Sequence, residues 1–298
     1  KLKKTYLDSK IIGKIQQNLY ALALSKIEES LPSYLINKYN FLDRKSCLKN
    51  IHFPKNQEEL AKAQYRLKFE ELFYIQLQLI RKKIIRKNKI KGYPFTAVGS
   101  YFSNFYKNHL PFELTNAQKR VLKEIRADLG SNAQMNRLLQ GDVGSGKTIV
   151  ALMSILLALD NGFQACLMAP TEILSEQHGI NFNNWFNQLG ITVAWLGGKT
   201  KGRERVATLE KIASGEAQMI VGTHALFQDE VKFHNLVLII IDEQHRFGVA
   251  QRSKLWHKNT SPPHVLVMTA TPIPRTLAMS VYGDLDISVI DELPAGRK

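Results

Sequence analysis

The sequence predicts a parallel, doubly wound α/β domain that follows a mostly α-helical region. After about residue 114, short apolar runs alternate with helical stretches, which is typical of strand–helix–strand units in a parallel sheet. Some runs, such as Leu236–Asp242, are almost continuously apolar, as in strands covered on both faces. Residues 1–95 contain few such runs. We therefore expect a helical region at residues 1–95 and an α/β domain at residues 96–298.

Composition excludes several classes of protein. The 298 residues are 44% hydrophobic, which is ordinary for a globular chain with a buried core. No run of about 18 apolar residues is present, and the first ten residues do not resemble a secretory signal. Cys47 and Cys166 are too few for a disulfide framework or a cysteine-based zinc site. We expect a cytoplasmic protein without a membrane span. Because the first residue is Lys rather than Met, we expect a piece of a longer chain.

The net charge of +15 is concentrated in the first third of the chain. Residues 1–95 hold 21 Lys and Arg against 8 acids, whereas residues 96–298 are nearly balanced. Excess Lys and Arg favour binding to a polyanion such as DNA, because each cation that neutralises a phosphate releases condensed counterions. The same lysines could simply solvate helices. Both interpretations stay open.

A long helix is expected from about Gln57 to Lys87. It ends in seven cations between Arg81 and Lys91, and a helix C-terminus favours cations, so this cluster requires no DNA. Gly92 and Pro94 are expected to stop the helix. Apolar residues recur at spacings of three and four, which predicts an amphipathic helix; they are Leu60, Ala63, Leu67, Phe69, Leu72, Phe73, Leu79, Ile80 and Ile84, with the polar Gln76 among them.

Six strands and five helices are expected in the α/β domain. The strands are Arg137–Gln140, Ala165–Ala169, Thr192–Leu196, Gln218–Val221, Val237–Ile241 and Val265–Met268. The helices begin near Gly146, Thr171, Gly202, Phe247 and Pro274.

A complete phosphate-binding motif follows the first of these strands. Its pattern, G-x-x-x-x-G-K-[ST], is formed by Gly141, Asp142, Val143, Gly144, Ser145, Gly146, Lys147 and Thr148. Glycines let backbone N–H groups turn toward phosphates, and the following helix adds positive potential at its N-terminus. Lys147 is expected to reach the β- and γ-phosphates of ATP, and Thr148 to coordinate Mg²⁺.

A carboxylate pair follows the strand Val237–Ile241. Asp242 is expected to hold Mg²⁺, and Glu243 to orient and deprotonate the attacking water. Gln244 and His245 complete this DEQH sequence, with His245 as a further catalytic candidate and Gln244 as a candidate for coupling nucleotide state to nucleic acid. Hydroxyl groups of Thr269 and Thr271, at the end of the next strand, could bond Asp242 or His245 and couple nucleotide state to a nucleic-acid track.

Gln118 and Phe112, which precede the phosphate motif, are candidates for binding the adenine base. Gln118, 23 residues before Gly141, could read the base edge as donor and acceptor at once. Phe112 could stack on the base. A surface glutamine at a helix start is the alternative for Gln118.

These motifs, in this order, resemble those of superfamily 2 helicases, and further segments resemble the RecG family. The matching segments are IHFP at Ile51–Pro54, RLKFEELF at Arg66–Phe73, GDVGSGKT, APTEILSEQH at Ala169–His178, VGTHALF at Val221–Phe227, IDEQHRFGVAQR at Ile241–Arg252 and MTATPIPRTLAMSVYGDLD at Met268–Asp286. The core also resembles the transcription-repair coupling factor. The first two segments favour RecG.

This resemblance implies a RecA-like P-loop domain and ATP-driven remodelling of branched or forked DNA, such as stalled replication forks and Holliday junctions. It implies a monomer that needs a second motor domain to complete its ATP site, and a wedge barrel before the helical region. We expect neither within these 298 residues, which alone should therefore hydrolyse ATP weakly or not at all. The residues implied to meet DNA are Pro170, Thr171, Glu172, Gly198, Lys199, Gly222, Thr223 and His224. A solvated helix start is the alternative for the cluster around Lys199.

Four hypotheses therefore remain. The first is a branched-DNA helicase, which forked DNA should stimulate. The second is a nucleotide-gated nucleic-acid-binding module, which would bind ATP without turnover. The third, an RNA helicase of the DExH type, would prefer RNA over forks. The fourth, a small-molecule kinase, is disfavoured by the DEQH and Thr269–Thr271 stations.

Overall fold

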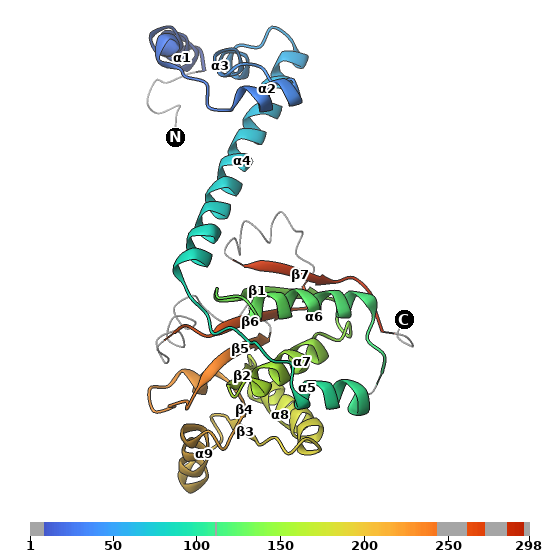
Figure 1. Cartoon of the computed structure of the whole chain (residues 1–298). Coiled ribbons are helices and arrows are strands. Elements are labelled where there is room, and N and C mark those ends of the chain that lie inside the picture. The colour runs from blue at the N-terminus through green and yellow to red at the C-terminus, as the bar shows by residue number, and fades with distance from the viewer. Residues whose placement is uncertain (1–8, 111, 243–260, 272–284, 295–298) are drawn as a thin grey trace. The chain divides into compact units, whose positions relative to one another are not determined.

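The computed structural model describes residues 9–110, 112–242, 261–271 and 285–294. The chain forms two compact units, residues 1–78 and 79–298, and the division falls inside the long helix α4 (Figure 1). No helix in the described part of the chain is long and apolar enough to cross a membrane.

The first unit is helical, as expected. It contains α1 (Ser9–Ala23), a short 3₁₀ turn η2 (Leu24–Lys26), α2 (Ser33–Tyr39), α3 (Arg44–His52) and the first part of α4 (Gln57–Lys89). The α4 helix begins at the predicted residue and ends two residues later than predicted. Its apolar stripe is only partly covered, because Leu72, Ile80 and Ile84 are at least half exposed.

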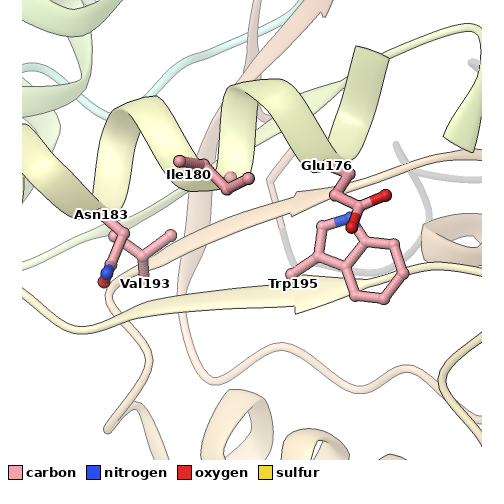
Figure 2. A pocket seen from close by; sticks show the side chains of 6 residues that line it. Glu176, Ile180, Asn183, Val193 and Trp195 are labelled. Atoms are coloured by element: carbon pink, nitrogen blue, oxygen red, sulfur yellow. The ribbon is translucent and has the colours of Figure 1, made fainter. Parts of the chain in front are cut away.

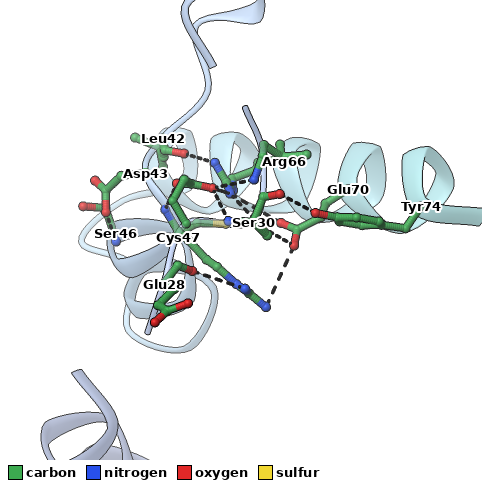
Figure 3. Close-up of polar contacts among 12 residues, drawn as sticks. Glu28, Ser30, Leu42, Asp43, Ser46, Cys47, Arg66, Glu70 and Tyr74 are labelled. Atoms are coloured by element: carbon green, nitrogen blue, oxygen red, sulfur yellow. Dashed lines mark hydrogen bonds and ion pairs between the residues drawn. The ribbon is translucent and has the colours of Figure 1, made fainter. Parts of the chain in front are cut away.

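A buried arginine ties the first unit together (Figure 3). The side chain of Arg66, on α4, is 0% exposed and donates through Nη1 to the Leu42 carbonyl oxygen at 2.6 Å. Its Nη2 pairs with Glu29 and lies 3.4 Å from Glu70. Glu70 also accepts a hydrogen bond from Ser30. Arg66 and Glu70 belong to the RLKFEELF segment, whose charged residues therefore hold α4 against the preceding loops.

Replacing Arg66 with methionine is expected to destabilise the first unit by about 3 kcal/mol, because it leaves the carboxylate of Glu70 without its buried partner. Hydrogen exchange of the α2 and α3 amides measures this, since all three tryptophans of the chain lie in residues 79–298. The control is Lys62→Met on the same helix, whose ion pair with Glu58 is exposed to solvent. Equal exchange rates in the two variants would contradict the role of Arg66.

The second unit is built on a seven-stranded parallel sheet of order β3-β4-β2-β5-β6-β1-β7 (Figure 1). The strands are β1 (Asn136–Gly141), β2 (Gln164–Met168), β3 (Val193–Leu196), β4 (Met219–Gly222), β5 (Leu236–Asp242), β6 (His264–Thr269) and β7 (Asp286–Ile290). The six expected strands are all present, each within one or two residues. The expected α/β fold with a parallel sheet is confirmed.

Helices cover both faces of this sheet. Alternate strand residues point to opposite faces, and the buried residues accordingly form two clusters. Leu139, Leu167 and Ile240 pack with α6 (Asn116–Leu129), α7 (Lys147–Asp160) and α8 (Glu172–Asn187). Leu138 and Cys166 pack on the other side with α9 (Gly202–Ser214) and the turn η4 (His224–Phe227). The short α5 (Ser100–Asn104) and η3 (Phe105–His109) precede α6.

The expected helix starts at Gly146, Thr171 and Gly202 match α7, α8 and α9 within one residue. Those near Phe247 and Pro274 lie outside the described residues. In the described part of this unit, α6, the edge strand β7 and the short elements α5, η3 and η4 are additions to the expected set. Strand β7 begins with an acid and has only two buried residues, so it lacks the continuous apolar run that marks the other strands.

The start of β7 is held by the last turns of α4. Lys83 and Lys87 both pair with the carboxylate of Asp286. Burial alone would raise the pKa of Asp286, but hydrogen bonds from the two lysines outweigh it and hold the pKa below 3.8. Lys83 and Lys87, two members of the cation cluster, thus have a structural partner.

This ion cluster predicts a pH dependence. A carboxylate whose pKa is lowered by folding stabilises the fold above its unfolded pKa of about 3.9, and loses that contribution as the pH falls through the folded value. Asp286→Asn should therefore lower the stability of the second unit by about 1 kcal/mol at pH 7, since both lysines are a third or more exposed. The difference should shrink below about pH 4. Urea unfolding followed by tryptophan fluorescence tests this, and a constant difference from pH 7 to pH 3 would refute it.

Candidate functional site

The predicted phosphate motif and the predicted carboxylate lie at the same edge of the sheet. Strand β6 lies between β1 and β5, and Met268 of β6 is level with Leu139 on one side and Asp242 on the other. Adjacent strands are about 4.8 Å apart, so the Asp242 Cα lies roughly 10 Å from that of Leu139. The chain passes from β1 directly into the phosphate motif. Parallel pairing therefore brings residues about 95 apart in sequence to one edge.

The phosphate motif forms a tight loop that leads into α7. Gly144 and Gly146 have φ angles of 81° and 85°, a region that side chains disfavour. A Cβ at Gly146 would also lie 2.3 Å from Nε2 of Gln118. Nζ of Lys147 donates to the carbonyl oxygens of Gly141 and Asp142, at 2.9 and 3.0 Å, across the loop. Such a loop, at the N-terminus of a buried helix, fits an anionic ligand.

Gln118 holds this loop from the side. It is fully buried, which differs from the surface alternative stated above. Its Oε1 accepts from the Thr115 backbone N–H at 2.9 Å, and its Nε2 donates to the Ser145 carbonyl oxygen at 2.8 Å. Glu292, beyond β7, accepts from the Ala117 N–H in the same turn. The adenine contact stays a prediction, while in this conformation the amide supports the phosphate loop.

A pocket of about 390 Å³ opens beside the loop. Phe112 lines it together with Gly144, Gly146, Lys147, Thr148, Ile149, Trp185 and Pro294. Phe112 is 40% exposed, so its ring is open to a ligand. The volume lies within the range of small-molecule sites. The residues present therefore fit a nucleotide whose base lies near Phe112 and whose phosphates lie in the loop.

Asp242 takes its hydrogen bond from a residue that sequence reasoning did not assign. Nε2 of His178, on α8, lies 2.8 Å from Oδ2 of Asp242. Thr269 and Thr271 bond one another, the Thr271 N–H donating to the Thr269 hydroxyl at 3.2 Å, and neither has a hydrogen bond to Asp242 in the described structure. Glu243, Gln244 and His245 lie outside the described residues, so their roles stay predictions.

The residues predicted to meet DNA form three nucleic-acid stations, at residues 170–172, 198–199 and 222–224. Glu172 joins these three stations. Its Oε1 accepts hydrogen bonds from the Gly198 N–H at 2.8 Å and from the Thr223 hydroxyl at 3.0 Å. Thr171 caps the same helix, its hydroxyl accepting from the Leu174 N–H at 3.3 Å. A Cβ at Gly197 would clash with Oε2 of Glu172 and with the Trp195 ring, so a larger residue there would displace one of these side chains. Glu172 therefore joins segments that lie 26 and 51 residues away.

The remaining predicted nucleic-acid residues lie around this junction. Lys199 and His224 are exposed, Pro170 is half-buried, and Gly222 is buried at the end of β4. A hollow of about 400 Å³ opens further along α8, between Glu176, Ile180 and Asn183 of that helix and Val193 and Trp195 of β3 (Figure 2). None of the residues that line this hollow lines the nucleotide pocket, and Glu172 is not among them.

Comparison with known proteins agrees with this geometry. Residues 115–280 match the model of the DEAD/DEAH box helicases, and this match covers more than half of the chain. The chain belongs to the DEAD/DEAH box helicase family.

Within that family the chain is similar to RecG, which confirms the resemblance seen in the sequence. It is 52% identical over 94% of its length to the ATP-dependent DNA helicase RecG of Pasteurella multocida, and 49% identical over 93% to that of Synechocystis sp.. It spans 41% and 33% of those relatives. The solved structure described as RecG bound to a three-way DNA junction matches 99% of this chain with a TM-score of 0.77 and 41% identity, over 39% of that chain.

Proposed function

We propose that this chain is the ATP-binding motor region of an ATP-dependent helicase that remodels branched DNA, such as stalled forks and Holliday junctions, in the bacterial cytoplasm. The observation that carries the proposal is the shared sheet edge. The phosphate loop after β1 and Asp242 at the end of β5 flank the β6 terminus, where Thr269 lies. The similarity to a RecG chain whose structure was solved on a three-way junction supports the choice of DNA.

In this proposal the protein binds and orients the triphosphate. The loop N–H groups and Lys147 hold the phosphates, Phe112 meets the base, and Thr148 and Asp242 hold Mg²⁺. When bound, Mg²⁺ offsets the negative charge of the phosphate oxygens. Glu243, directly after Asp242, accepts the proton of the attacking water. A second motor domain completes the site, and one protein molecule acts alone.

Glu172 holds the segments that are proposed to bind DNA in position relative to one another. Its carboxylate would repel a phosphate, so Glu172 orders the stations at Gly198 and Thr223 rather than touching DNA itself. Backbone N–H groups, Lys199 and His224 then meet the phosphates. Backbone contacts of this kind position a strand without reading its bases.

Stimulation of ATP hydrolysis by defined nucleic acids, measured on the full-length protein that supplies the second motor domain, tests the proposal. A three-way DNA junction should raise the rate more than single-stranded DNA, linear duplex DNA or structured RNA of equal length. Linear duplex as the best activator would favour a translocase like the transcription-repair coupling factor, and structured RNA would favour an RNA helicase. Nucleotide binding without stimulation by any of them would instead indicate a nucleotide-gated binding module.

A further inference from the structure

The imidazole of His178 contacts the proposed metal carboxylate directly. His178 and Asp242 come from α8 and β5, and their side chains are 12% and 16% exposed. An ionised carboxylate can only accept a hydrogen bond, so Nε2 of His178 is the donor to Oδ2. No described residue donates to Oδ1, which leaves that oxygen to face a metal. Outer-shell donors of this kind orient the carboxylates that bind metals.

We propose that His178 is a positioning residue that orients Asp242 for Mg²⁺, and that α8 thereby links the nucleic-acid stations to the metal site. This inference rests on the proposed ATP site. His178 itself touches neither nucleotide nor metal; it acts through the carboxylate it holds.

Packing of α8 holds His178 in place. The ring of Phe182, one turn further along the helix, lies 6.2 Å from the imidazole, and Phe182 and Phe186 are fully buried. On the same helix, Ser175 accepts a hydrogen bond from the Trp195 indole at 2.8 Å. These contacts seat the imidazole against Asp242 and tie its position to that of α8.

The same helix carries the junction at Glu172. Glu172 and His178 are six residues apart, which corresponds to about 9 Å along a helix. A shift of α8 that accompanies DNA binding at Gly198 and Thr223 would therefore change how His178 meets Asp242. Fewer than two turns of helix separate the proposed DNA side from the proposed metal side.

Three variants test the role of His178. His178→Phe removes the donor and keeps an aromatic ring, whereas His178→Gln keeps a nitrogen donor at nearly the position of Nε2. Gln177→Ala, at the exposed neighbouring residue of the same helix, is the matched control. The readout is the Mg²⁺ concentration that half-maximally promotes binding of fluorescent ADP, which needs no hydrolysis.

We expect His178→Phe to raise this Mg²⁺ midpoint about tenfold, as for other outer-shell partners of metal ligands. His178→Gln should restore it to within about threefold, and Gln177→Ala should leave it unchanged. Binding of ADP in EDTA should be the same in all four proteins. Weaker binding by His178→Phe in EDTA would reveal a merely structural role, and an unchanged Mg²⁺ midpoint would refute the inference.

Adding a three-way DNA junction tests the link through α8. The junction should shift the Mg²⁺ midpoint of the wild type and of His178→Gln but not that of His178→Phe. An equal shift in His178→Phe would refute the link. If Mg²⁺ does not affect ADP binding by the wild type, the proposed ATP site itself fails, which is distinct from a failure of His178 alone.

Discussion

Replacing Lys147 with alanine is expected to lower ATP hydrolysis by the full-length protein at least about a hundredfold, because it removes the one side-chain cation of the phosphate loop that can meet the developing charge. The loop would keep its shape, since Gly144, Gly146 and the Gln118 contact to Ser145 are unaffected. What is lost is the ammonium group that now bonds the carbonyl oxygens of Gly141 and Asp142. Nucleotide affinity should fall together with the rate.

The control for this variant is Lys123→Ala, at an exposed position of α6. It removes the same charge from the same unit and should leave hydrolysis unchanged. Tryptophan fluorescence during urea unfolding should show both variants folded, with Lys147→Ala within about 1–2 kcal/mol of the wild type. Hydrolysis at the wild-type rate by a folded Lys147→Ala protein would show that Lys147 and its loop do not act in ATP hydrolysis.

In the full-length protein, replacing Glu243 with glutamine should separate ATP binding from ATP hydrolysis. An amide is nearly the same shape as a carboxylate but cannot accept the proton of water, and loss of a general base typically costs about 10²–10⁴ in rate. ATP binding should persist because Lys147, Thr148 and Asp242 are intact. Filter retention of radiolabelled ATP in Mg²⁺ should therefore find uncleaved nucleotide on the variant and ADP on the wild type.

Glu230→Gln is the matched control for this variant, since Glu230 is a half-exposed acid that pairs with Arg205 and has no assigned role in the ATP site. It should turn over ATP like the wild type. If Glu243→Gln hydrolyses ATP at the normal rate, another group accepts the proton. If it fails to bind ATP while remaining folded, Glu243 contributes to binding rather than to chemistry.

The fold was predictable where burial left a local pattern. Strands covered on both faces must be apolar along their length, so runs such as Leu236–Asp242 mark themselves in the sequence. Strand β7 lies at the edge of the sheet; its first residue, Asp286, is paired by Lys83 and Lys87, and Asp291, just after it, is paired by Arg120. Polar pairing of this kind leaves no periodic signal, because the partners lie more than 150 residues away.

The candidate site was likewise predictable only where its residues are neighbours in the sequence. The phosphate loop is recognisable because glycines, lysine and threonine must occur at fixed spacing along one turn. The contacts of Glu172 with Thr223 and of His178 with Asp242 join residues 51 and 64 positions apart. Each of these residues stood inside a recognised segment, but only the packing of α8 beside β3, β4 and β5 reveals what the carboxylate and the imidazole hold.

A crystal structure of this chain with Mg²⁺ and a non-hydrolysable ATP analogue would show whether Thr148 and Asp242 share the metal. We expect phosphates within the loop of residues 141–148, and Mg²⁺ about 2.1 Å from the Thr148 hydroxyl oxygen with Asp242 as ligand or one water away. A metal held without Thr148 and Asp242, or a triphosphate bound elsewhere, would contradict this expectation.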